Sequence, residues 1–119
     1  MSLYNFNEIL KIAQERDFKA IGSFNLHCIE MLPAFFKAAQ NSRSPLMIQI
    51  STGTAEYLGY RFLVDAVRSL ADSENIPTCL HLDHCSDIKA IETAMNAGFS
   101  SVMYDGSHLR KARSEEHTS

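Results

Sequence analysis

The sequence has few cysteines, no excess of positive charge and no long apolar run, and each shortage excludes a class of protein. Its three cysteines, Cys28, Cys79 and Cys85, are odd in number and lack zinc-type pair spacing, so free thiols in a reducing cytoplasm are expected. The net charge of −3 gives no basic face for nucleic acid. No stretch approaches the roughly 18 apolar residues of a membrane span, and residues 1–5 lack the charged-then-apolar order of a signal peptide. We therefore expect a cytoplasmic globular protein with neither nucleic-acid nor membrane partners.

Helical and strand-like segments alternate along the 119 residues. Apolar residues at helical spacing predict helices over residues 5–16, 29–40, 60–72 and 88–97. Short apolar runs predict strands, buried on both faces, over residues 19–24, 46–50, 78–83 and 99–104. Because helices separate the strands, the pattern indicates βαβ units and a parallel sheet. A small open sheet and half of a (β/α)8 barrel, which needs about 250 residues, both fit this α/β pattern.

Several details of these helices are also predicted. Pro33 is tolerable only in a first turn, Asn5 or Asn7 can cap the first helix, and Ser86 or Asp87 can cap the last, which ends at Gly98. The expected buried stripes are Phe6, Ile9, Leu10 and Ala13; Met31, Leu32, Phe35, Ala38 and Ala39; Phe62, Leu63, Ala66, Val67 and Leu70; and Ile88, Ile91, Ala94 and Met95.

Polar side chains follow each predicted strand. The first ends at Asn25, the second is followed by the hydroxyl-rich segment 51–54, the third ends at Asp83 and His84, and the fourth leads to Asp105. The carboxyl ends of parallel strands share one rim, where α/β enzymes place their chemistry. An imidazole there can bind a metal, a carboxylate beside it can move a proton, and backbone N–H groups near residues 51–54 can hold a phosphate.

Four segments carry a resemblance to a known family. They are GSFN at residues 22–25, SPLMIQIS at 44–51, HLDH at 81–84 and AGFSSVMYDGSH at 97–108. In order and in spacing, over about residues 3–109, the chain resembles the class II, metal-dependent fructose-bisphosphate/ketose-bisphosphate aldolases. The resemblance implies the N-terminal half of a (β/α)8 TIM barrel. It also implies a glycolytic lyase that splits fructose or tagatose 1,6-bisphosphate into dihydroxyacetone phosphate and glyceraldehyde 3-phosphate.

The resemblance also implies roles for individual residues. His84 would be a ligand of the catalytic zinc, and Asp83 the proton donor and acceptor at the substrate hydroxyl. Asp105 would serve a second divalent metal or orient the first, while Asn25 and Ser51 would line the substrate site. Cleavage beside a ketone leaves an enediolate whose charge zinc can spread as a Lewis acid, so no lysine Schiff base is needed. The family favours a homodimer or homotetramer.

The resemblance stops after Leu109. Residues 113–119, RSEEHTS, are what a widely used sequencing adapter encodes in one frame, so we expect residues 1–109 to be a partial barrel domain and residues 110–119 a non-native or disordered tail. The family draws two further zinc-ligand histidines from later strands, and none of His27, His81, His108 and His117 matches them. We therefore expect this chain alone to bind zinc weakly, to lack aldolase activity and to be poorly soluble, with two open sheet edges.

Each candidate residue also has a purely structural interpretation. His84 could bond to a turn, Asp83 could cap a helix, and Asp105 before Gly106 could form a turn. Ser51 and Asn25 could belong to ordinary loops after strands. His81 is expected to be a packed or supporting histidine rather than a metal ligand, and Cys85 is not expected to be a ligand.

Two other functions deserve comparison. The segment from Cys79 to His84 is one residue from the His-x-His-x-Asp-His run of binuclear metallo-hydrolases, but Cys stands where the first His belongs and no glycine pair follows. A non-catalytic barrel subunit that binds sugar phosphates would keep Asn25 and Ser51 but would not need Asp83.

Overall fold

The computed structural model describes residues 3–17 and 21–104, which form one parallel four-stranded sheet in the order β1-β2-β3-β4. The strands are β1 (Gly22–Asn25), β2 (Leu46–Ser51), β3 (Thr78–Cys85) and β4 (Ser101–Tyr104). All three pairings are parallel, which confirms the predicted α/β class. Residues 19 and 20 of the predicted first strand lie outside the described residues.

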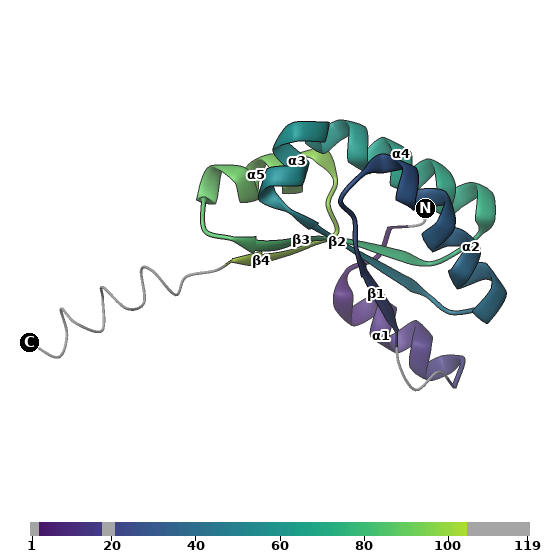
Figure 1. Cartoon of the computed structure of the whole chain (residues 1–119). Helices are drawn as coiled ribbons and strands as arrows, with labels where there is room; N and C mark the ends of the chain where they lie inside the picture. Colours follow the sequence, from purple (N-terminus) through teal and green to yellow (C-terminus); the bar gives the residue numbers. More distant parts are fainter. Residues whose placement is uncertain (1–2, 18–20, 105–119) are drawn as a thin grey trace, which may run out of the picture.

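Helices cover the two faces of the sheet unequally (Figure 1). The short 3-10 helix η1 (Ile29–Met31) leads into α2 (Leu32–Ser42), which shares one face with α3 (Thr52–Leu58), α4 (Tyr60–Glu74) and α5 (Ile88–Ala97). Among the described residues, the other face carries one helix, α1 (Phe6–Glu15). In a closed (β/α)8 barrel, helices cover the outer face of the sheet. The face covered by α2–α5 therefore corresponds to the outside of such a barrel, and the face that carries α1 corresponds to its interior.

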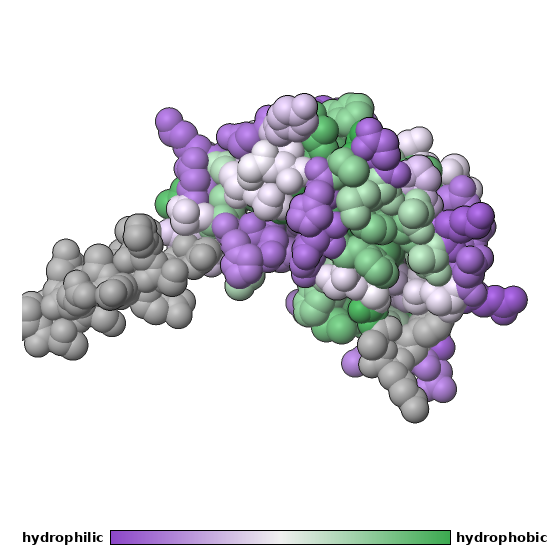
Figure 2. Space-filling model, viewed as in Figure 1, coloured by the Kyte–Doolittle hydropathy of each residue, from purple (hydrophilic) through white to green (hydrophobic). Residues whose placement is uncertain are grey.

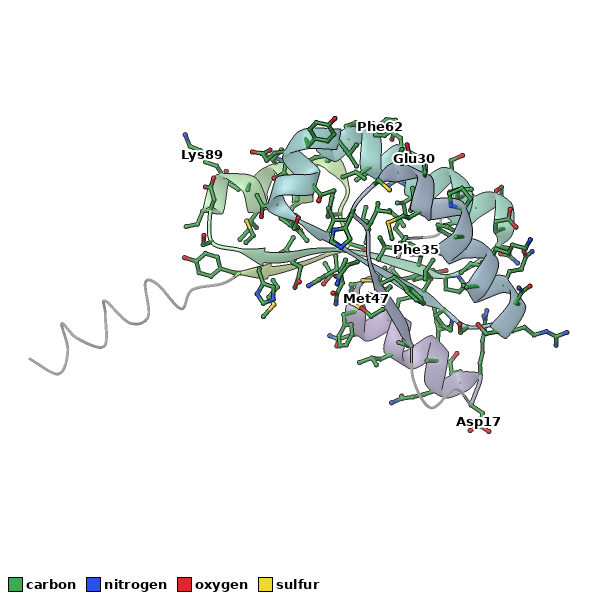
Figure 3. All side chains as sticks on the ribbon, in the orientation of Figure 1. Asp17, Glu30, Phe35, Met47, Phe62 and Lys89 are labelled. Atoms are coloured by element: carbon green, nitrogen blue, oxygen red, sulfur yellow. The ribbon has the colours of Figure 1, made fainter. Side chains whose placement is uncertain are left out.

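The side chains of the strands divide between these faces. Those directed toward α2–α5 form the main core with the helices, and include Leu46, Ile48, Ile50, Leu80 and Leu82. On the opposite face, Met47 and Cys79 pack against Ile9 of α1 in a second, smaller cluster (Figure 3). A groove of about 670 Å³ lies beside this cluster. The prediction that the strands are buried on both faces is therefore wrong for this face.

The helix ends follow the predicted capping chemistry. Asn5 caps α1, and its side chain and that of Glu8 bond each other's backbone N–H groups. Pro33 lies in the first turn of α2. Asp87 caps α5, and Gly98 ends it in the left-handed conformation, with a φ of 116°. These caps confirm the predictions. They could be predicted from the sequence because capping depends on residues that are close together in the chain.

Several residues of the predicted buried stripes are exposed in the structure. Phe36 is buried in α2, whereas the predicted Ala38 is exposed. Phe62 projects from α4 away from the sheet (Figure 3), and Ile88 and Met95 are exposed on α5. In α5 the buried residues are Ala90 and Ala94, since small side chains let this helix approach the sheet closely.

Helix α3 was not predicted, because residues 51–54 resemble a hydroxyl-rich loop. Ser51 caps α3, and Gly59, with a φ of 100°, separates it from α4. β3 also continues two residues beyond the predicted end at Asp83. Both differences concern the carboxyl ends of strands, where the candidate site lies.

Candidate active site

Three of the predicted site residues lie on one face of the sheet, at the carboxyl ends of their strands. Ser51 pairs with Asp83 in the register between β2 and β3, and Asn25 pairs with Gln49 between β1 and β2. Side chains alternate along a strand, so Asn25, Ser51 and Asp83 all project opposite to the face covered by α2–α5. Asn25, Ser51 and Asp83 therefore lie together at the carboxyl ends of the strands, on the face of the sheet that carries α1.

His84 reaches this rim through an irregularity in β3. The register between β3 and β4 shifts between Leu82 and Cys85, and His84 has a φ of +47°. In a regular strand His84 would project opposite to Asp83. The bulge instead brings its Nε2 within 3.5 Å of Asp83 Oδ2, and leaves 66% of its side chain exposed. Bulges commonly redirect side chains beside active sites in this way.

Asp83 lies between two imidazoles. His81 Nε2 approaches Asp83 Oδ1 at 3.6 Å, and His84 Nε2 approaches the other oxygen. His81 is buried, and its Nδ1 lies 2.8 Å from the Ser101 hydroxyl. Burial lowers the pKa of His81, and the charge of Asp83 opposes that shift only in part. The arrangement favours a neutral His81 behind the carboxylate.

The Ser51 hydroxyl serves the local fold. It accepts a hydrogen bond from the Thr54 N–H at 3.2 Å and donates one to Thr54 Oγ1 at 3.1 Å, so it acts as the N-cap of α3. A hydroxyl oxygen has a second lone pair, so capping leaves one acceptor position. Asn25 is exposed. Asp105 lies outside the described residues.

Two histidines in the described part of the chain are exposed, His27 and His84, and His84 is the one that lies beside Asp83. Within residues 3–17 and 21–104, no three His, Cys, Asp or Glu side chains are grouped so as to hold an ion. The buried thiol of Cys85 donates to the Asp87 carbonyl at 3.3 Å, and Cys79 is fully buried. Catalytic zinc sites use three protein ligands and one open position. His84 therefore suits zinc as one ligand of a larger set, and the burial of Cys79 disfavours the metallo-hydrolase interpretation.

Helices on one face of a parallel sheet, with polar groups on the carboxyl rim of the other, place the molecule in the α/β class, with the arrangement that barrel enzymes of this class use. Comparison with known proteins narrows this class. Residues 4–119 match the family model described as fructose-bisphosphate aldolase class-II. The chain therefore belongs to the class II fructose-bisphosphate aldolase family, whose members are lyases.

Individual relatives agree with this family. The chain is 42% identical over 103 residues to the fructose-bisphosphate aldolase of Helicobacter pylori strain 26695, covering 86% of this chain and 33% of that one. It is 38% identical over 111 residues to that of Geobacillus stearothermophilus, covering 91% of this chain and 38% of that one. The chain thus spans about a third of the length of these relatives.

Solved structures give the same fold. The YdjI aldolase from Escherichia coli K12 superposes with a TM-score of 0.70 at 25% identity, over 85% of this chain and 39% of that one. The fructose-bisphosphate aldolase of Campylobacter jejuni, at 24% identity and a TM-score of 0.61 over 81% of this chain and 31% of that one, supports the fold alone. The four strands accordingly correspond to part of a TIM barrel.

Proposed function

We propose that this chain is part of a metal-dependent class II aldolase that reversibly cleaves fructose 1,6-bisphosphate, or tagatose 1,6-bisphosphate, to dihydroxyacetone phosphate and glyceraldehyde 3-phosphate. The observation that carries the proposal is the bulge in β3, which brings Asp83 and His84 to the same rim. In a regular strand, two consecutive residues would project to opposite faces. Family membership supports the same conclusion.

Asp83 is the proposed proton-transfer group. Its carboxylate accepts the proton of the substrate hydroxyl while the O–H electrons form the new carbonyl. The electrons of the breaking carbon–carbon bond pass to the ketone half, and Asp83 returns the proton in the reverse reaction. Its side chain is 24% exposed, so substrate can reach it.

The remaining residues bind and orient. His84 is the proposed zinc ligand within this chain, and the metal, when bound, supplies a Lewis acid for the substrate oxygens. Asn25 and Ser51 contact the substrate from the neighbouring strands. Asp105 is proposed to serve a second divalent metal or to orient the first. The other zinc ligands would come from the part of the relatives that this chain does not span.

The test uses a complete barrel. Residues 4–109 of this chain replace the matching segment of the H. pylori aldolase, to give a protein that we call the grafted aldolase. We expect Asp83→Asn to lower kcat at least 100-fold with zinc retained, and His84→Ala to lower zinc content and activity together. Asp65→Asn, which removes an exposed carboxylate on α4, is the matched control and should change neither. An undiminished kcat after Asp83→Asn, or full zinc content after His84→Ala, would overturn the proposal.

The DNA sequence downstream of the codon for Ser119 provides an independent test. The family model extends over residues 110–119, but residues 113–119 have the sequence that an adapter encodes, so we propose that residues 110–119 are not native and that the coding sequence continues into strands carrying two zinc-ligand histidines. Resequencing the locus should reveal both histidines, whereas a genuine stop codon after Ser119 would contradict the idea. A continuation lacking them would favour a non-catalytic sugar-phosphate-binding subunit.

For the whole protein we propose a cytoplasmic homodimer or homotetramer. In the described part of the chain, no helix is long and apolar enough to cross a bilayer.

A further inference from the structure

We propose that His81 is a positioning residue for Asp83, and that Ser101 of β4 fixes the imidazole tautomer that performs this task. The inference deepens the proposed function and depends on the role given there to Asp83. Its basis is a continuous polar contact across two strands, from Ser101 through His81 to Asp83.

The two nitrogens of His81 face different groups. Ser101 is the register partner of His81, and its hydroxyl lies 2.8 Å from Nδ1. Asp83 Oδ1 lies 3.6 Å from Nε2. A carboxylate accepts and does not donate, so Nε2 must carry the ring proton if it is to bond Asp83. In a neutral ring, Nδ1 is then an acceptor, and the Ser101 hydroxyl donates to it.

This tautomer would hold the Asp83 carboxylate in one orientation. Rotation of a carboxylate about its terminal torsion is otherwise broad and roughly two-fold. An N–H directed at Oδ1 from a buried ring restricts that rotation and leaves Oδ2 toward the exposed rim. The distance of 3.6 Å is longer than a hydrogen bond, and catalytic contacts that are long in an empty site often tighten only when substrate binds. Orienting groups behind metal-site and catalytic residues typically contribute 10–100-fold.

A space-filling role is the alternative for His81. Its ring lines the groove beside Met47 and Gln49, where an apolar ring of similar size would also fit. The two roles separate under substitution. His81→Phe keeps the ring and loses both nitrogens, whereas His81→Gln retains an N–H donor at the far end of the side chain.

Steady-state kinetics of the grafted aldolase test the inference. We expect His81→Phe to lower kcat about 10-fold or more, with KM and zinc content unchanged, and His81→Gln to recover part of the loss. Ser101→Ala should lower kcat in the same direction. Ser100→Ala is the matched control: it removes a hydroxyl that accepts from the Leu80 N–H at 2.9 Å, whereas the hydroxyl bonded to the His81 ring is that of Ser101, so kcat should be unchanged.

Nitrogen-15 NMR of the histidines provides a readout that does not depend on activity. In the unsubstituted grafted aldolase, His81 should show a protonated Nε2 and an unprotonated Nδ1, and Ser101→Ala should mix the two tautomers. A protonated Nδ1, or equal kcat for His81→Phe and the parent, would overturn the positioning role. If Asp83→Asn stays inactive in that case, the proposed function stands and only this inference fails. If Asp83→Asn is active, the proposed function itself fails.

Discussion

Four non-glycine residues among those described have positive φ angles: Asp17, Arg43, Asn75 and His84. The first three lie at or just after helix ends, where the left-handed conformation is common. His84 instead has this conformation within a strand, at the bulge beside Asp83. Backbone strain of this kind costs of order 1–3 kcal/mol and gathers at functional sites. It is the price of presenting both side chains on one rim.

The strain at His84 can be measured by comparing two substitutions. His84→Gly and His84→Ala both remove the imidazole, but only glycine adopts positive φ without a Cβ clash. We therefore expect the glycine variant of the grafted aldolase to be about 1 kcal/mol more stable than the alanine variant in urea unfolding. Both should lose zinc to the same extent. An alanine variant at least as stable as the glycine variant would show that the bulge is not strained.

Sequence reasoning proposed Asp83 and His84 as site residues but did not predict how the strand brings them together. The HLDH segment identifies both as chemically suited groups, yet alternation along a strand would place them on opposite faces. The bulge depends on the pairing of β3 with β4, which no local pattern reveals. Ser101 was missed for the same reason, because its contact with His81 exists only in the register between these strands.

Among the helices of the part of the chain that the structure describes, α1 is the one that lies by itself on its face of the sheet (Figure 1). Ile9 is fully buried against Met47 and Cys79, while Phe6 and Leu10 line the groove with 43% and 38% of their surfaces exposed. With so little packing around it, α1 depends strongly on its own end-capping. Short helices without tertiary support are marginal in water.

The capping box of α1 gives a prediction at the scale of one element. Asn5→Ala removes the oxygen that accepts from the Glu8 N–H at 2.8 Å, and should lower the free energy of unfolding by about 1 kcal/mol. Hydrogen exchange should rise first in α1. Asn7→Ala is the matched control, because Asn7 is exposed inside the same helix and makes no cap, so alanine should be neutral or slightly stabilising. Equal destabilisation by both substitutions would contradict the assignment.

The existence of most elements followed from periodicity, but the buried face of each helix followed less well. Phe62 continues the apolar pattern of α4, yet 51% of it is exposed, because α4 directs Leu63, Val64 and Val67 inward instead. In α5 the alanines, not Ile88 and Met95, approach the sheet. Periodicity identifies an amphipathic helix, but how the helix is rotated against the sheet is decided by packing of the whole layer.

The whole molecule has one well-covered face and one open face. β1 and β4 are the ends of the strand order, and the groove on the open side includes exposed Phe6, Leu10 and Met103. Apolar residues also gather in a band down the face seen in Figure 2. Exposed edges and apolar grooves promote association with other chains, and in a closed barrel further strands would cover both.

This openness predicts how the 119-residue chain behaves alone. We expect it to bind an apolar dye, to form progressively larger species as its concentration rises in sedimentation experiments, and to bind zinc weakly. The grafted aldolase should bind little dye, keep one defined oligomeric state and hold zinc tightly. Leu10→Ser should reduce dye binding, because Leu10 lines the groove. Tyr57→Ser is the control, since Tyr57 is 88% exposed on α3, on the other side of the sheet. A monomeric chain with no dye binding and tight zinc binding would mean that this portion of the barrel closes on itself, and that His84 finds its further ligands within these residues.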